Sequence, residues 1–166
     1  DTLFAVLNKS STAGGSRRLK DWLLRPLHDL ERINERHDAV EELFKNTLSR
    51  REIRDILKGF QDVERLLSRL GHGSISPRDL DSLKTSLSTV KDLKQFLSEE
   101  PLKSKLMKKL VKSIDIHKQV SKKLEEAIVE DPPLVLRDGG IFKKGYSKEL
   151  DDLRSKATSG REWVAS

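Results

Sequence analysis

Residues 76–97 read SPRDLDSLKTSLSTVKDLKQFL, and this stretch decides the fold of the chain. Ser76 is a predicted N-cap, and Pro77 follows at a first-turn position where its missing N–H is harmless. Asp79 places a carboxylate near the positive end of the predicted helix. The apolar residues that follow recur every three or four positions, which puts them on one helical face: Leu80, Leu83, Leu87, Val90, Leu93 and Leu97. The stretch therefore predicts an amphipathic α-helix that begins after Ser76.

The same periodicity predicts helices on the N-terminal side of this stretch. Asp29 is a predicted N-cap for a helix that begins after it and carries apolar residues at helical spacing. Shorter helices are expected over residues 16–24, 48–57 and 63–70. Ala13-Gly14-Gly15 indicates flexible or tightly turned backbone before the first of them.

The region after residue 100 has a less regular pattern. Residues 102–128 predict either one long helix or two, with a bend near Ser113 favoured. Pro132-Pro133 ends this helical run. Asp138-Gly139-Gly140 lies between two short apolar stretches, residues 134–136 and 141–143, and predicts a turn that joins two very short strands.

A last helix is expected from Ser147 onward, with Leu150, Leu153, Ala157 and Val164 facing inward. Because the chain begins with Asp and ends within this helical pattern, we expect a piece of a longer protein. The 166 residues are 36% charged, 35% hydrophobic and 5% aromatic, so the core must consist mainly of Leu, Ile and Val. The expected fold is all-α, an irregular multi-helix bundle with at most one tiny two-stranded hairpin.

Composition also excludes several classes of protein. The chain has no cysteine, which rules out disulfides, thiolate zinc sites, iron–sulfur clusters and a cysteine nucleophile. No apolar run approaches the ~18 residues that a membrane span needs. We therefore expect a soluble, intracellular protein without a membrane partner.

No motif points to catalysis or to a bound cofactor. The four histidines are far apart in the sequence, and none has the spacing of a metal-binding pair: His28, His37, His72 and His117. A Gly-x-Ser-x-Gly nucleophile elbow and a Gly-rich phosphate-binding loop are both missing. We expect no catalytic residue, no metal and no cofactor in this chain.

A run of lysines is the strongest charge feature. Residues 101–124 hold eight lysines and one acid, a net charge of +7, whereas the whole chain carries +6. Four of these lysines share one helical face: Lys105, Lys108, Lys109 and Lys112. Such a face is usually a solvated surface, but it also suits contacts with nucleic-acid phosphates that read no sequence. No aromatic residues lie between the lysines, so stacking on single-stranded bases is not supported.

A set of short strings, in order along the whole chain, resembles one known family. The sequence is similar to the core, or lever, domain (domain III) of the MutS family of DNA mismatch repair proteins in these strings: Thr2-Leu3-Phe4, Leu7-Asn8, Arg17-Arg18-Leu19, Trp22-Leu23, Arg25-Pro26-Leu27, Asp38-Ala39-Val40-Glu41-Glu42-Leu43, Asp62-Val63-Glu64-Arg65-Leu66-Leu67-Ser68-Arg69, Ser76-Pro77-Arg78-Asp79-Leu80 and Leu136-Arg137-Asp138-Gly139-Gly140. Each string alone is unspecific, but their ordered succession is a specific signal.

The resemblance implies that residues 1–166 are part of one helical core domain, cut where its long helix would run toward a DNA-gripping clamp. The mismatch-recognition, clamp and ATPase domains of the family would lie elsewhere. The fragment would then not be an enzyme, while the parent protein would be a dimeric DNA-dependent ATPase that uses ATP and Mg. The parent would bind mismatched duplex DNA, recruit a MutL-type partner and reside in the cytoplasm, or in the nucleus of a eukaryote.

Two functional hypotheses follow from these observations. The first is a non-catalytic lever that links the ATPase to the clamp. Its expected structural residues are Trp22, Leu23, Pro26 and Leu27 at the first corner, with Trp22 in the core, and Leu150 and Leu153 on the outgoing helix. The alternative is a self-contained basic helical module that binds the nucleic-acid backbone through Lys105, Lys108, Lys109 and Lys112.

Overall fold

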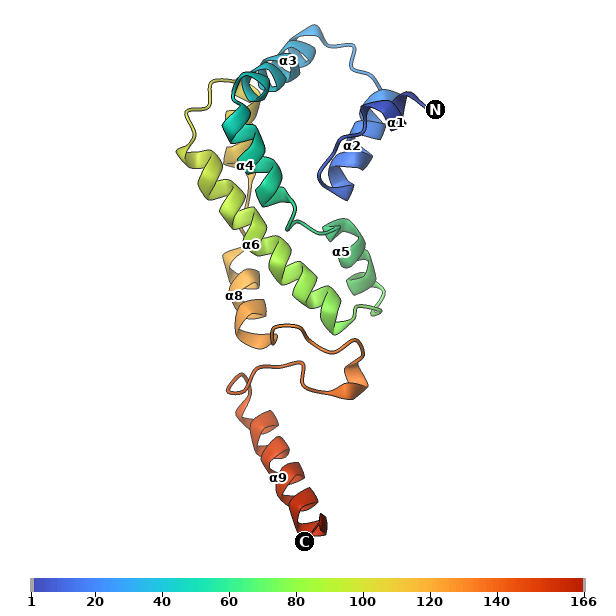
Figure 1. Cartoon of the computed structure of the whole chain (residues 1–166), viewed down its shortest axis with the longest axis vertical. Coiled ribbons are helices and arrows are strands. Elements are labelled where there is room, and N and C mark those ends of the chain that lie inside the picture. The colour runs from blue at the N-terminus through green and yellow to red at the C-terminus, as the bar shows by residue number, and fades with distance from the viewer. Residues whose placement is uncertain (1, 166) are drawn as a thin grey trace.

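The computed structural model describes the backbone of residues 2–165 and the side chains of residues 2–157. Within that part it contains no sheet, which confirms the all-α prediction. Figure 1 shows an elongated arrangement of helices. The elements are α1 (Leu3–Leu7), α2 (Ala13–Leu24), α3 (Leu30–Lys45), α4 (Thr47–Leu57), α5 (Val63–Gly71), α6 (Pro77–Glu99), α7 (Lys105–Ser113), α8 (Lys118–Ala127), the 3-10 turn η1 (Leu136–Asp138) and α9 (Lys148–Ala165).

Helix α6 runs through the middle of the body (Figure 1). Its start is the predicted one: the Ser76 hydroxyl accepts a hydrogen bond from the Asp79 N–H at 3.2 Å, and the Asp79 carboxylate accepts one from the Ser76 N–H at 3.0 Å. With 23 residues, α6 is about 34 Å long. Helices α4, α5, α7 and α8 all contact it, and α3 packs on α4 and α7.

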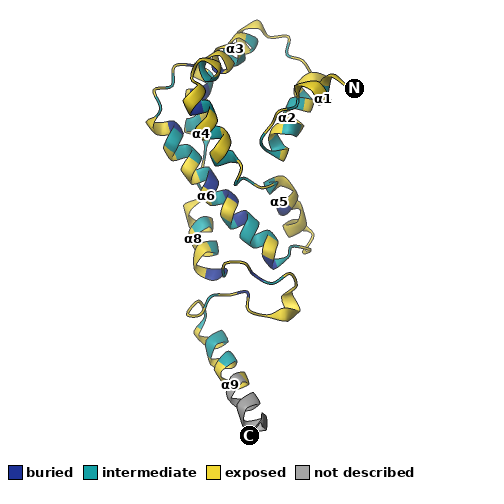
Figure 2. Ribbon diagram, viewed as in Figure 1, coloured by how far each residue is buried: buried dark blue, intermediate teal, exposed yellow. Residues whose placement is uncertain are grey.

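Helix α6 carries several buried residues, which are dark blue in Figure 2. Near its C-terminal end, Leu97 packs with Ala39 of α3 and Met107 of α7. Near its N-terminal end, Leu80 packs against a second cluster, formed by Ala127, Ile128 and Ile141. The body is thus stabilised by two small apolar clusters that α6 connects.

Small residues bring the segment between α4 and α5 close to the middle of α6. A Cβ atom on Gly59 would lie 2.7 Å from Oγ1 of Thr89, closer than side chains tolerate. The Thr89 hydroxyl donates to the Thr85 carbonyl, and the Ser86 hydroxyl accepts from the Gln61 N–H at 3.1 Å. Glycine at position 59 therefore permits the approach of these two segments.

Helices α1 and α2 stand apart from this body (Figure 1) and contain no buried residue. The predicted burial of Trp22 is wrong: its side chain is 40% exposed, with the Arg36 guanidinium 3.9 Å from the ring centroid. Leu23 and Pro26 are also exposed, and Leu27 is half-buried. Local periodicity placed Trp22 on the same helical face as Leu19, but the contacts of this face with Leu7 of α1 and Arg36 of α3 leave the ring partly exposed.

Helix α2 begins three residues earlier than predicted. The Thr12 hydroxyl accepts a hydrogen bond from the Gly15 N–H at 3.0 Å and acts as the N-cap. Ala13-Gly14-Gly15 therefore forms the first helical turn and is not flexible or tightly turned backbone. An N-cap hydrogen bond of this kind stabilises a helix by about 1 kcal/mol, which offsets part of the ~2 kcal/mol that the low helix propensity of the two glycines costs in that turn.

Residues 102–128 form two helices, α7 and α8, and the break follows Ser113 as favoured. His117 adopts a left-handed conformation with φ of 44° and donates its N–H to the Asp115 carboxylate at 2.9 Å. The Lys94 ammonium of α6 donates to the Ile114 carbonyl at the end of α7. These contacts, and not a Pro or Gly, separate the two helices.

The predicted hairpin is wrong in the described residues. An isolated bridge pairs Phe142 with Ile128, so the partner of residues 141–143 is the end of α8. Residues 136–138 form a 3-10 turn instead of a strand, with Leu136 exposed. Ile128 is 2% exposed, and burial of this residue decides the pairing.

The last helix, α9, is present, but its expected inward face is only partly correct. Leu150 is half-buried, whereas Leu153 is 57% exposed and Ala157 is also exposed. The expectation for Val164 concerns a side chain outside the described residues. None of the helices in the described part of the chain combines the length and hydropathy that a membrane crossing requires.

The described chain exposes an unusually large surface for its size. Its accessible surface is 12673 Å², whereas a compact monomer of 18.9 kDa exposes roughly 8,300 Å². Many large apolar side chains are exposed, among them Leu24, Leu30, Phe44 and Leu48. The molecule is therefore an extended set of helices around α6.

We predict that Gly59→Ala destabilises the chain by ~1–3 kcal/mol, because the added methyl group would displace the buried Thr89 side chain. Gly71→Ala is the matched control, since nothing lies within 4 Å of a Cβ atom there. Urea unfolding followed by far-UV circular dichroism measures both. Equal stability of the two variants would contradict this account of the α4–α6 approach.

Candidate functional site

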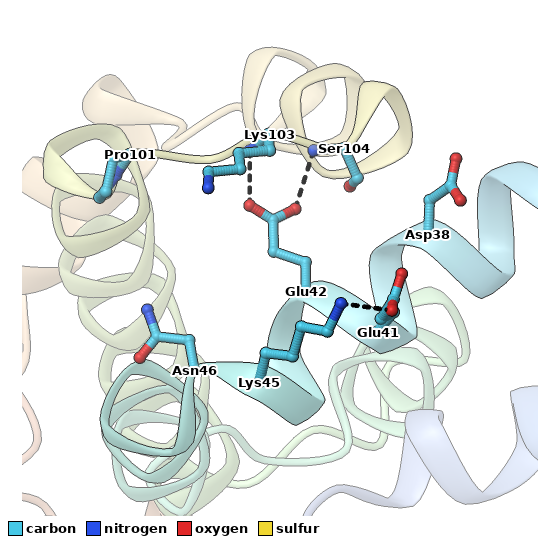
Figure 3. A pocket seen from close by; sticks show the side chains of 8 residues that line it. All are labelled: Asp38, Glu41, Glu42, Lys45, Asn46, Pro101, Lys103 and Ser104. Carbon is cyan, nitrogen blue, oxygen red and sulfur yellow. Dashed lines mark hydrogen bonds and ion pairs between the residues drawn. The ribbon is translucent and has the colours of Figure 1, made fainter.

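The corner between α3 and α4 faces the segment that joins α6 to α7. The Glu42 carboxylate of α3 accepts hydrogen bonds from the backbone N–H groups of Lys103 and Ser104, the latter at 2.9 Å (Figure 3). A second carboxylate, that of Glu100 after α6, accepts a hydrogen bond from the Ser49 hydroxyl of α4. We call Glu42 and Glu100, with these partners, the carboxylate clamp.

The carboxylate clamp fixes the start of α7. The Ser104 hydroxyl caps the helix by accepting from the Met107 N–H at 3.2 Å, while Glu42 satisfies the Ser104 N–H itself. Burial raises the pKa of Glu42, but the hydrogen bonds from Lys103 and Ser104 outweigh it and hold this pKa below its usual value. Glu42 is thus an ionised carboxylate at neutral pH that ties α3 to α7.

A groove runs beside the carboxylate clamp, and Figure 3 shows the residues that line it. Three of its charged groups already have partners within the chain: Glu41 pairs with Lys45 at 2.5 Å, which lowers the pKa of Glu41, and Glu42 binds the backbone of α7. The lining residues are Asp38, Glu41, Glu42, Lys45, Asn46, Pro101, Lys103 and Ser104. They include no His or Cys, and their one hydroxyl, that of Ser104, caps α7.

The lysine run of the sequence becomes an exposed face on α7. Lys105, Lys108, Lys109 and Lys112 are all exposed, and Met107 on the other side of the helix is buried against α3 and α6. None of the four has an ion pair among the described residues. Lys105 borders a second groove, whose lining includes Glu31, Glu35 and Asp38 of α3. We refer to the four lysines as the α7 basic face.

The structure brings no metal-binding group together in the residues it describes. Each histidine lies in a different part of the chain and has different neighbouring residues. The His72 ring nitrogen lies 2.7 Å from the Ser68 carbonyl, and the His117 ring nitrogen lies 3.7 Å from the Asp115 carboxylate.

Sequence analysis missed Arg17, which joins α2 to the start of α5. Its guanidinium binds both oxygens of Asp62, at 2.8 and 2.7 Å, and also contacts Glu64 at 2.6 Å. This hydrogen bonding lowers the pKa of Asp62 and raises that of Arg17. Asp62 is the N-cap of α5, which is a role that local sequence can indicate. Its pairing with Arg17, 45 positions away, leaves no pattern in the local sequence.

We predict that Glu42→Gln lowers stability by ~1 kcal/mol at pH 7, because an amide is a weaker acceptor for the α7 backbone than a carboxylate. The pKa of Glu42 is lower in the folded chain than its usual value of 4.5. Its contribution is therefore present above that value and is lost as the pH falls through the folded-state pKa.

The stability difference between wild type and Glu42→Gln should therefore shrink between pH 6 and pH 3, measured by urea unfolding. Glu52→Gln, at an exposed helix position, is the control. A difference for Glu42→Gln that stays constant down to pH 3 would contradict the role of the ionised carboxylate.

Comparison with known proteins gives a consistent result over the whole chain. Residues 1–162 match the family model for MutS domain III. Proteins named DNA mismatch repair protein MutS from Halothermothrix orenii and Alkaliphilus metalliredigens are each 42% identical over 164 residues, and that from Methanosarcina acetivorans is 40% identical over 168 residues. These alignments cover 99% of this chain but 18–19% of each relative, so the chain spans about a fifth of the curated relatives it matches.

Proposed function

Because the chain belongs to the MutS family, with its domain III matched over residues 1–162, we propose that residues 1–166 form part of the core, or lever, domain of a DNA mismatch repair protein. The segment is a non-catalytic helical element that links the ATPase to the DNA-gripping clamp. In the whole protein we propose mismatched duplex DNA as substrate, ATP with Mg as cofactors, a dimeric state and a MutL-type partner.

The observation that carries this proposal is the arrangement of the body around α6. This helix is about 34 Å long, and α4, α5, α7 and α8 are packed along it. A packed helix moves as a rigid body, so a small rotation at one end displaces the other end further. Such a unit is suited to transmit a movement between domains without chemistry of its own.

Two connections provide places where such a movement can be taken up. Residues 25–29 link α2 to α3 without helical structure, next to the corner formed by Trp22, Leu23, Pro26 and Leu27. Residues 114–117 separate α7 from α8, with His117 in a left-handed conformation. Short non-helical connections absorb changes of φ and ψ while the helices stay intact. Leu150 and Leu153 belong to α9, which extends away from the body (Figure 1).

A self-contained basic module is the weaker alternative. Its chemical basis, the α7 basic face, covers one helix, whereas the family match covers residues 1–162. The exposed Leu24, Leu30, Phe44 and Leu48 also favour a segment whose apolar faces are covered by other parts of a larger protein. The lever role accounts for the whole chain, and the basic face is a separate property of α7.

We predict that Arg17→Ala weakens the coupling between ATP and DNA in the complete protein that carries this segment. The change removes the contacts of α2 with Asp62 and Glu64, through which a movement of α2 would reach α5 and α6. The affinity for mismatched DNA and the rate of ATP hydrolysis without DNA should stay within about twofold of the wild-type values. The effect of ATP on DNA affinity should fall at least about fivefold, a loss of ~1 kcal/mol of coupling.

Arg18→Ala is the matched control for this experiment, because Arg18 is its neighbour on α2 and makes a 3.9 Å contact with Asp21 within the same helix. Titration of labelled mismatched duplex with and without ATP measures the coupling. Loss of ATP hydrolysis, DNA affinity and coupling together would indicate general damage and contradict the lever proposal. The same coupling loss in Arg18→Ala would contradict it as well.

A further inference from the structure

The α7 basic face lies on the exposed side of its helix. At about 100° per residue, Lys105, Lys108, Lys109 and Lys112 fall within an arc of roughly 100°. The centre of that arc lies almost opposite the buried Met107. The four side chains are therefore exposed, and at one end of the face Lys105 borders a groove against α3.

The charges of this face are not neutralised by ion pairs. Among the described residues, some lysines on other helices pair with an acid three or four positions away, as in Lys45–Glu41 at 2.5 Å and Lys84–Asp81 at 2.7 Å. No such pair involves a lysine of the α7 basic face, since α7 contains no acidic residue. Four adjacent positive charges thus remain available to an anionic partner.

The acids nearest to this face belong to α3, and they lie toward the start of α7. Lys105 borders the groove lined by Glu31, Glu35 and Asp38. Lys108 is close enough to Glu42 for its charge to help lower the pKa of that carboxyl group. Lys109 and Lys112 do not line this groove, and the acid that follows them, Asp115, interacts with His117 and Lys94.

We propose that the α7 basic face, centred on Lys109 and Lys112, contacts the phosphate backbone of duplex nucleic acid without reading its sequence. The four lysines span about 10 Å along the helix, and a duplex presents roughly six charges over that length. Lysine ammonium groups bind phosphates as point charges, and α7 has no aromatic residue on which single-stranded bases would stack. The carboxylate clamp holds the start of α7 in place, so the face is presented on a fixed helix.

This inference goes beyond the lever role, which needs no contact between this segment and DNA. Within the lysine run it concerns α7 alone, and on α8 Lys122 pairs with Glu126 at 3.7 Å. The two proposals can therefore fail independently.

Fluorescence anisotropy of the 166-residue chain with a labelled, fully matched duplex tests the proposal. The quadruple variant Lys105→Gln, Lys108→Gln, Lys109→Gln and Lys112→Gln is compared with a control that has the same net charge. The control replaces four exposed lysines on other elements by glutamine: Lys20, Lys91, Lys144 and Lys148. Circular dichroism confirms that both variants keep the helical content of the wild type.

We expect wild-type affinity to fall with salt, and the slope of log K against log salt to decrease in magnitude by about 3 to 4 in the α7 variant. The slope of the control variant should change by less than half as much. A mismatch in the duplex should have no effect on the affinity of the wild-type chain. Absence of salt-dependent duplex binding would overturn the proposal, as would equal losses in the two variants. Binding of a poly-glutamate peptide as tight as that of the duplex would overturn it in favour of an acidic protein partner.

Paired substitutions test the centre of the face. Lys109→Gln with Lys112→Gln should reduce the slope by about 2, and Lys105→Gln with Lys108→Gln by clearly less, because the acids of α3 already offset part of their charge. The two pairs have the same charge and lie on the same helix. An equal or larger loss for the Lys105 and Lys108 pair would overturn the assignment of the centre.

Discussion

Burial of one face of α6 is the constraint on which the rest of the structure depends. The face includes Leu83, Ser86, Thr89 and Leu97, and it joins the two apolar clusters of the body. The hydroxyl groups of Ser86 and Thr89 can be buried because they donate to the carbonyls four residues earlier in the same helix. Their small size lets the residues around Gly59 approach α6, which a larger side chain would prevent. The path of the chain from α4 to α5 follows from that approach.

Polar contacts extend this limited core to the outer helices. With 36% charged and 5% aromatic residues, the chain has few large apolar side chains to bury. Its corners are tied by hydrogen bonds to charged groups, as in the contacts of Glu42 with α7, of Glu100 with α4 and of Arg17 with Asp62. Hydrogen bonds of this kind depend on direction, so they fix how one helix is oriented on the next. That property fits an element proposed to transmit movement rather than to catalyse a reaction.

The features that the sequence predicted are those with a local cause. Ser76 and Asp29 cap the helices that follow them because a side-chain oxygen and a backbone N–H three residues on are enough to form the contact. The break after Ser113 was also predicted, but its cause, a contact from Lys94 on α6, was not. The lysines on one face of α7 follow from helical spacing alone.

The features that were missed depend on residues far apart in the sequence. Trp22 lies on the apolar face of its helix, but periodicity does not say whether another element covers that face. Residues 141–143 pair with the end of α8 because Ile128 is buried there, and no turn signal indicates that partner. The contacts of Glu42 with Lys103 and of Arg17 with Asp62 bridge 61 and 45 positions, so only the folded chain reveals them.

Native-state hydrogen exchange of the 166-residue chain tests the central role of α6 most directly. Amides in the middle of α6, around residues 83–93, should exchange at least about 100-fold more slowly than those of α2, which contains no buried residue and is held to the body by polar contacts. Amides of α6 that exchange as fast as those of α2 would contradict the account. Protection of the α2 amides as strong as that of the α6 amides would contradict the account as well.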